Sequence, residues 1–69
     1  MKNNLSERRD ECELTQGDLG AAVGVSRQRI NPIERDRYDP SLELVFKLAA
    51  YFDCQVEELF DPDIEPVGE

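Results

Sequence analysis

The amino-acid sequence predicts a compact, all-α domain of five helices. Apolar residues recur at helical spacing in five stretches separated by capping residues and glycine, and no stretch has the alternation of a strand. A chain of 69 residues forms one domain at most. We expect residues 1–60 to fold and residues 61–69, DPDIEPVGE, to form an acidic, extended tail because two prolines interrupt it.

The first helix is predicted over residues 4–13. Asn4 can cap it, and Glu7 occupies the third helical position, from which its side chain can reach back to the start of the helix. The spacing i, i+4, i+7 places three residues on one face: Leu5, Arg9 and Cys12. A charged Arg9 within this face requires a partner.

The second helix is predicted over residues 15–23. Thr15 is its N-cap, and Asp18, three residues later, completes a near capping box. The side chains expected to face inward are those of Leu19, Ala22 and Val23. Gly24 supplies the positive φ that ends the helix.

The third helix is expected to begin almost at once, with Ser26 as its N-cap, so that the second and third helices cross at a steep angle. Ile30 and Ile33 attach this helix to the core. Pro32 is its sixth residue, where the missing N–H group and the ring cost about 3 kcal/mol. We expect the helix to continue through Pro32 with a distortion rather than to end near Asn31.

The fourth helix is predicted from its N-cap Ser41 to Phe52, and a short fifth helix over residues 56–60. The fourth helix is apolar on nearly all sides, which is more than a domain of this size can cover. One stripe contains Leu42, Val45, Phe46, Ala49 and Phe52, and a second contains Leu44, Leu48 and Tyr51. We expect the second stripe to form a homodimer interface, with coverage by the fifth helix and the tail as the alternative.

The charge of the chain is −8, and its distribution is uneven. Residues 1–42 carry eight acidic and seven basic residues, whereas residues 43–69 carry eight acidic residues and one base. Four arginines fall between residues 27 and 37, which predicts a local positive patch. Because the chain has only two lysines, we interpret the acidic surface as an adaptation to high internal salt, with an ordinary solvated surface as the alternative.

Metal binding and catalysis are not indicated. Cys12 and Cys54 lie 42 residues apart in a chain without histidine, and we expect reduced, buried thiols rather than a zinc site or a disulfide. The sequence has no phosphate-binding glycine loop and no nucleophile with a base, so we expect no cofactor, no small-molecule ligand and no enzymatic activity.

No 18-residue apolar run and no apolar signal core occur, so we expect no membrane association and a cytoplasmic location.

Residues 14–42, LTQGDLGAAVGVSRQRINPIERDRYDPSL, resemble the helix-turn-helix family of the lambda repressor and Cro, also called Xre-type regulators. The likeness extends from Leu5 to Phe60, with TQ opening the second helix, GVS at the turn, then RQ, IE, YDPSL and VEELF. It implies a lambda-repressor-like fold in which helices two and three form the DNA-reading pair. It also implies that residues 1–60 are the DNA-binding domain of a transcriptional regulator, usually a dimer.

The resemblance assigns expected roles around the third helix. The side chains expected to read bases in the major groove are Arg27, Gln28 and Asn31, since Gln suits adenine and Arg suits guanine. The residues expected to contact the DNA backbone are Gln16, Ser26, Arg29, Arg35 and Arg37. For Arg27 and Arg29, base contact and phosphate contact are equally favoured.

Arg9 and Glu34 match a buried ion pair of the family, which would supply the partner that Arg9 needs. The alternative is an Arg9 side chain that extends to the surface.

The sequence also departs from the family pattern. Pro32 replaces a residue that can join in base contact, so base reading should concentrate at the start of the helix. Glu13 and Asp36 replace Gly or Asn and should need a positive φ or a rearranged turn. Gly20 replaces a packed alanine, at a cost of about 1 kcal/mol in helix propensity.

A second class of function is a protein-interaction module, such as an antitoxin or adaptor built on the same fold. The acidic C-terminal third and Pro32 favour this alternative. The exposed face of the third helix separates the two classes, since a positive face fits DNA and an acidic or apolar face fits a protein.

Overall fold

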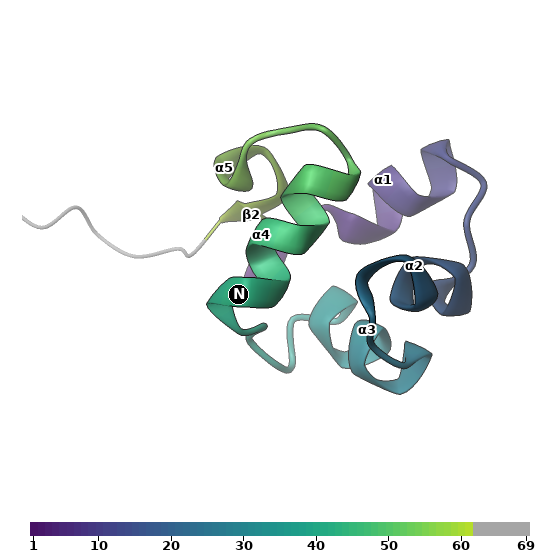
Figure 1. Ribbon diagram of the computed structural model, residues 1–69. Coiled ribbons are helices and arrows are strands. Elements are labelled where there is room, and N and C mark those ends of the chain that lie inside the picture. Colours follow the sequence, from purple (N-terminus) through teal and green to yellow (C-terminus); the bar gives the residue numbers. More distant parts are fainter. Residues whose placement is uncertain (62–69) are drawn as a thin grey trace, which may run out of the picture.

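The computed structural model describes residues 1–61, which form five helices and a two-stranded sheet (Figure 1). The order along the chain is β1 (Lys2–Asn3), α1 (Leu5–Glu11), α2 (Gln16–Val23), α3 (Arg27–Glu34), α4 (Leu42–Tyr51), α5 (Val56–Leu59) and β2 (Phe60–Asp61). All five predicted helices are present. Residues 62–69 of the predicted tail lie outside the described residues.

The small sheet joins the two ends of the described chain. β1 pairs antiparallel with β2, with Lys2 opposite Asp61 and Asn3 opposite Phe60. The sequence prediction of no strand was wrong, because strands of two residues are too short to show alternation. The side chain of Asn3 also donates a 2.8 Å hydrogen bond to the carbonyl group of Ile33, so β1 is fastened to the end of α3.

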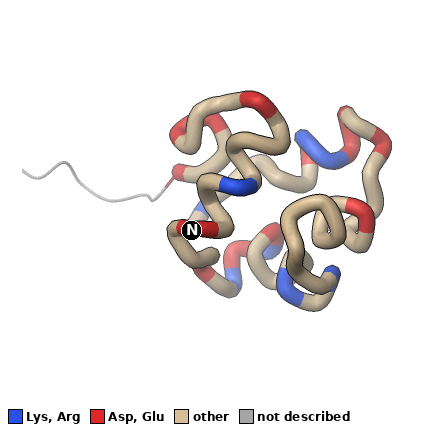
Figure 2. The backbone as a smooth tube through the Cα atoms, in the orientation of Figure 1, with Lys and Arg blue, Asp and Glu red and all other residues tan. Residues whose placement is uncertain are grey.

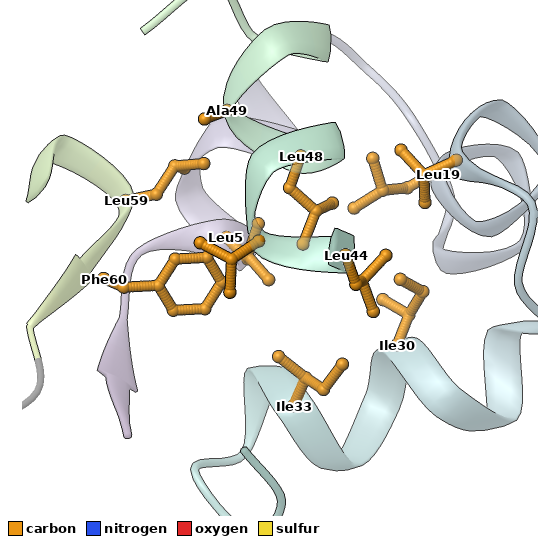
Figure 3. Packing of buried hydrophobic residues seen from close by; sticks show 11 residues of the cluster. Leu5, Leu19, Ile30, Ile33, Leu44, Leu48, Ala49, Leu59 and Phe60 are labelled. Atoms are coloured by element: carbon orange, nitrogen blue, oxygen red, sulfur yellow. The ribbon is translucent and has the colours of Figure 1, made fainter. Parts of the chain in front are cut away.

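Eleven buried apolar side chains form a single core around α4 (Figure 3). They are Leu5, Leu19, Val23, Ile30, Ile33, Leu44, Val45, Leu48, Ala49, Leu59 and Phe60, drawn from all five helices and β2. Ala22, which was expected to face inward, is exposed. The short fifth helix and β2 contribute Leu59 and Phe60, so these two elements close the core rather than extend from it.

The core face of α4 differs from the prediction. Leu44 and Leu48 are only 4% and 0% exposed, and in Figure 3 they point toward Leu19 and Ile30. Their assignment to a dimer interface was therefore wrong, because α2 and α3 cover this side of α4. Leu42 and Phe46, from the other stripe, are instead 70% and 58% exposed.

Two of the predicted N-caps form as expected. The Thr15 hydroxyl group accepts a 3.0 Å hydrogen bond from the backbone N–H of Asp18, whose carboxylate accepts one of 3.0 Å from the backbone N–H of Thr15. These two hydrogen bonds from Thr15 hold the pKa of Asp18 below its usual value. The Ser41 hydroxyl group accepts a hydrogen bond from the N–H of Leu44 at 3.2 Å.

The start of α1 departs from the prediction. Asn4 occupies the N-cap position but makes no side-chain cap hydrogen bond; its side chain donates instead to the carbonyl group of Glu58 at 2.8 Å. The N–H of Leu5 is bound by the side chain of Asn3, at 3.2 Å. Asn4 was thus misassigned because its side chain is drawn toward α5, a contact between residues far apart in the sequence.

Helices α1 to α4 end in the same way. A residue with positive φ follows each helix: Glu13 (56°), Gly24 (82°), Asp36 (62°) and Asp53 (54°). The backbone N–H of the next residue then donates a hydrogen bond of 2.8–3.0 Å to the carbonyl group five positions earlier. The pairs, donor first, are Leu14–Arg9, Val25–Gly20, Arg37–Pro32 and Cys54–Ala49. The positive φ expected for Glu13 and Asp36 is confirmed, and that of Asp53 was not predicted.

The turn between α2 and α3 is tightly packed at Gly20. A Cβ atom placed there would lie 2.5 Å from the carbonyl oxygen of Val25. Gly20 therefore permits the close approach of the two helices, a role that was not predicted from the sequence, where Gly20 was expected only to lower helix propensity. Beyond the turn, α3 continues through Pro32 to Glu34, as predicted.

The cysteines are free thiols, but they are less buried than expected. Cys12 follows the last residue of α1 and is exposed, while Cys54 is partly buried. The burial expected for Cys12 was wrong because α1 ends at Glu11, so Cys12 lies outside the helix and does not share the face of Leu5 and Arg9.

Within residues 1–61, no cluster of three or more potential metal ligands occurs. None of the helices in this part of the chain has the length and apolar character that a membrane span requires.

Candidate nucleic-acid interface

The start of α2 and one face of α3 form an open hollow of about 330 Å³. Its lining residues are Gln16 from α2 and Arg27, Gln28 and Asn31 from α3. All three side chains that were expected to read bases therefore lie together, beside a side chain that was expected to contact a phosphate. Arg29, Arg35 and Arg37 are exposed outside this hollow.

The hollow is supported by an ion pair between α1 and the last residue of α3. Arg9 Nε donates to Glu34 Oε2 at 2.8 Å and Arg9 Nη2 donates to Glu34 Oε1 at 3.2 Å. The two side chains are only 16% and 6% exposed. A further bond, from Arg9 Nη1 to the carbonyl group of Leu14 at 2.9 Å, fixes the guanidinium plane. Hydrogen bonding to Glu34 raises the pKa of Arg9 above its ordinary value.

The ion pair extends to the hollow through two amide side chains. Gln16 Nε2 donates to Glu34 Oε1 at 3.0 Å, and Asn31 Nδ2 donates to Gln16 Oε1 at 3.3 Å. Gln16 and Asn31 were expected to be separate DNA contacts, and the hydrogen bond between them was not predicted from the sequence. A signal was present, since Asn31 and Glu34 are three residues apart and so share one face of α3.

The first turn of α3 carries exposed polar and basic side chains. Ser26 is the N-cap of α3 but makes no side-chain cap hydrogen bond, so its hydroxyl group is not used in the helix. Arg27, Gln28 and Arg29 are exposed, whereas Pro32 is partly buried. The exposed polar side chains of α3 are therefore concentrated at its N-terminal half, while Asn31 and Glu34 in the C-terminal half are partly buried.

Positive charge along α3 and the loop after it is locally uncompensated. Residues 26–37 contain four arginines and two acidic residues, Glu34 and Asp36. Glu34 is paired with Arg9, and Asp36 with the ammonium group of Met1, whose pKa is raised by this contact and by Asp39. Within residues 1–61, no ion pair joins the four arginines to an acidic side chain.

These features define a helix-turn-helix protein with an exposed, basic surface at the start of α3. The helix-turn-helix family matches residues 5–59, and the chain belongs to this family, in its lambda-repressor and Cro-like (Xre-type) branch.

The relatives span nearly the whole chain. The protein is similar to an uncharacterised HTH-type transcriptional regulator of Methanocaldococcus jannaschii, with 50% identity over 60 residues, 87% of this chain and 91% of that protein. An HTH-type transcriptional regulator of Archaeoglobus fulgidus is 36% identical over 69 residues, 100% of this chain and 97% of that protein.

Two solved structures share the fold. The restriction-modification controller protein C.AhdI of Aeromonas hydrophila has a TM-score of 0.73 at 34% identity, and the match covers 81% of this chain and 85% of that chain. The P22 c2 repressor, solved in complex with a synthetic operator, has a TM-score of 0.72 at 31% identity, with 75% and 79% covered.

Proposed function

We propose that the protein is a sequence-specific, DNA-binding transcriptional regulator that places α3 in the major groove of double-stranded DNA. The observation that carries this proposal is the exposed face of α3, where Arg27, Gln28 and Asn31 line one hollow with Gln16. Amide and guanidinium groups are the side-chain groups that pair with adenine and guanine edges. The similarity to a repressor solved with its operator supports the same use of the fold.

The charge distribution supports DNA over a protein partner. In Figure 2 basic positions mark the start of α3, while acidic positions mark α5 on the opposite side of α4. The exposed face of α3 is therefore neither acidic nor apolar, which counts against the interaction-module alternative. Most of the net charge of −8 belongs to residues 43–69, which follow α3 and its loop in the sequence and carry eight acidic residues and one base.

We expect two substitutions to separate base reading from backbone binding. Gln28→Ala should flatten sequence preference at one base pair by about 1–3 kcal/mol, because it removes an amide from the reading surface. Arg37→Ala should weaken binding to all sequences alike and reduce the salt dependence, because a phosphate contact carries no sequence information. Selection of bound sequences from random DNA, followed by titrations at several salt concentrations, measures both effects. The assignment would be inverted if Arg37→Ala changed the preference and Gln28→Ala did not.

We propose further that the protein binds DNA as a homodimer through Leu42 and Phe46 rather than through the buried Leu44 and Leu48. These two exposed side chains lie one turn apart on α4. Leu42 lines a mainly apolar hollow and Phe46 lines a second hollow of mixed polarity, and Val56 and Glu57 of α5 line both. Tyr51 lines a separate hollow against α2. A two-fold dimer would present its α3 helices to successive major grooves about 34 Å apart.

We expect Leu42→Ser combined with Phe46→Ser to give a monomer with weakened operator binding, because it removes the apolar contact between copies. Tyr51→Ser is the matched control, since Tyr51 is also exposed but faces the α2 side. Sedimentation at micromolar protein in high salt, with and without DNA, measures the assembly state. A parent protein that remains monomeric on DNA would contradict the dimer, and dissociation by Tyr51→Ser alone would place the interface elsewhere.

A further inference from the structure

The hydrogen bonds that lead from Glu34 to the reading surface have a fixed direction. A carboxylate only accepts hydrogen bonds, so Glu34 Oε1 requires Gln16 to present its NH₂ group. The carbonyl oxygen of the Gln16 amide must then point the other way, where it accepts from Asn31 Nδ2. Asn31 in turn must direct its NH₂ group toward Gln16 and its Oδ1 away from it. The carboxylate at one end thus determines the orientation of the amide at the other.

Asn31 keeps the groups that a base contact needs. Only one hydrogen of its NH₂ group is used by Gln16, and neither Oδ1 nor the second hydrogen is bonded within residues 1–61. Both groups belong to a side chain that lines the open hollow. One free acceptor beside one free donor matches adenine, which presents its N6 amino group and N7 in the major groove. Guanine presents two acceptors there and does not match.

We propose that Glu34, acting through Gln16, is a positioning residue that makes Asn31 distinguish an A·T pair from a T·A pair. This inference rests on the proposed DNA-binding function. Exchanging A·T for T·A puts the thymine methyl group and O4 where adenine presented N7 and N6. An Asn31 amide of fixed orientation then sets its Oδ1 against O4, two acceptors, whereas an amide that is free to rotate by half a turn can donate its NH₂ group to O4, since this terminal torsion has two nearly equivalent states.

The test uses sequences selected from random double-stranded DNA by the full-length protein and three variants. The parent should prefer A·T in one orientation by about tenfold over T·A at one pair in each half-site. Asn31→Ala should abolish this preference and so identify the pair. Gln16→Ala should discriminate much less between A·T and T·A at that pair, while Arg37→Ala, which also loses a backbone contact, should bind more weakly with the orientation preserved.

Glu34→Gln addresses the anchor directly. A glutamine at position 34 can donate as well as accept, so the orientation of Gln16 is no longer dictated and the A·T orientation preference should fall. This variant also weakens the pair with Arg9, and it is therefore compared at a temperature where circular dichroism shows it to be folded. Gln16→Ala leaves the Arg9–Glu34 pair in place and provides the test if Glu34→Gln does not fold.

A measurement without DNA separates this inference from the proposed function. In the free protein, Gln16→Ala should shift the side-chain NH₂ resonances of Asn31 and speed their exchange with water, whereas Gln28→Ala should not. Unchanged Asn31 resonances in Gln16→Ala, or a retained A·T orientation preference in that variant, would overturn the inference alone. A parent protein that selects no DNA sequence, with the Asn31 resonances responding as expected, would instead overturn the proposed function and the base-reading role that depends on it.

Discussion

Arg9→Ala is expected to lower the free energy of unfolding by about 3 kcal/mol, near the lower end of the roughly 3–5 kcal/mol that follows from breaking a buried ion pair. The loss arises because the Glu34 carboxylate, only 6% exposed, would be left without its cationic partner. The lower end applies because Arg9 is itself 16% exposed and because Gln16 would still donate to Glu34 Oε1. A domain of this length has about 3–10 kcal/mol in total, at roughly 0.05–0.15 kcal/mol per residue.

Arg8→Ala is the matched control for this substitution. Arg8 is the neighbouring residue of α1, and its ion pair with Glu58 is longer, 3.8 Å, with a partner that is 53% exposed. A surface pair of this kind contributes about 0–1 kcal/mol. Urea unfolding followed by circular dichroism compares the two variants with the parent. Equal stabilities for Arg9→Ala and Arg8→Ala would show that the Arg9–Glu34 pair does not stabilise the fold.

The helices were predictable because their boundaries depend on short-range chemistry. Thr15 with Asp18, and Ser41 alone, cap their helices with side chains that lie within three residues of the bonded N–H group. Where the cap depends on tertiary contact, as at Asn4, the same rule failed. The side of α4 that faces the core was also not predictable, because Leu42 and Leu44 are equally apolar and only the positions of α2 and α3 decide between them.

The candidate site was predicted as a set of residues but not as a connected network. The Arg9–Glu34 ion pair was predicted because the first helix has a charged residue in an otherwise apolar face, and the family resemblance indicated Glu34 as its partner. The bonds from Gln16 to Glu34 and from Asn31 to Gln16 join residues 18 and 15 positions apart. Such bonds depend on side-chain rotamers and on the crossing of α2 and α3, which sequence spacing does not determine.

The largest effect expected on binding concerns salt, and it follows from the acidic charge. A dimer would carry −16, which is twice the −8 of one chain, and most of it lies in residues 43–69. At low salt this charge repels DNA over a long range. At about 1 M salt the screening length is roughly 3 Å, so remote acidic groups cease to act while direct contacts persist. Cations taken up near acidic groups would also offset those that the arginines release from DNA.

We therefore expect affinity for one operator to show a shallow or non-monotonic dependence on KCl between about 0.1 and 2 M, in contrast to the steep loss of an ordinary basic DNA-binding protein. Useful binding should persist near molar salt, and folding should weaken in dilute buffer because self-repulsion among the acidic groups is then unscreened. Fluorescence anisotropy titrations and thermal melts over the same salt series measure the two effects. Arg37→Ala serves as the control, since it removes one proposed phosphate contact and leaves the acidic residues 43–69 unchanged. A steep, monotonic loss of affinity together with full stability in dilute buffer would contradict the high-salt interpretation, and the acidic residues would then act only as an ordinary solvated surface.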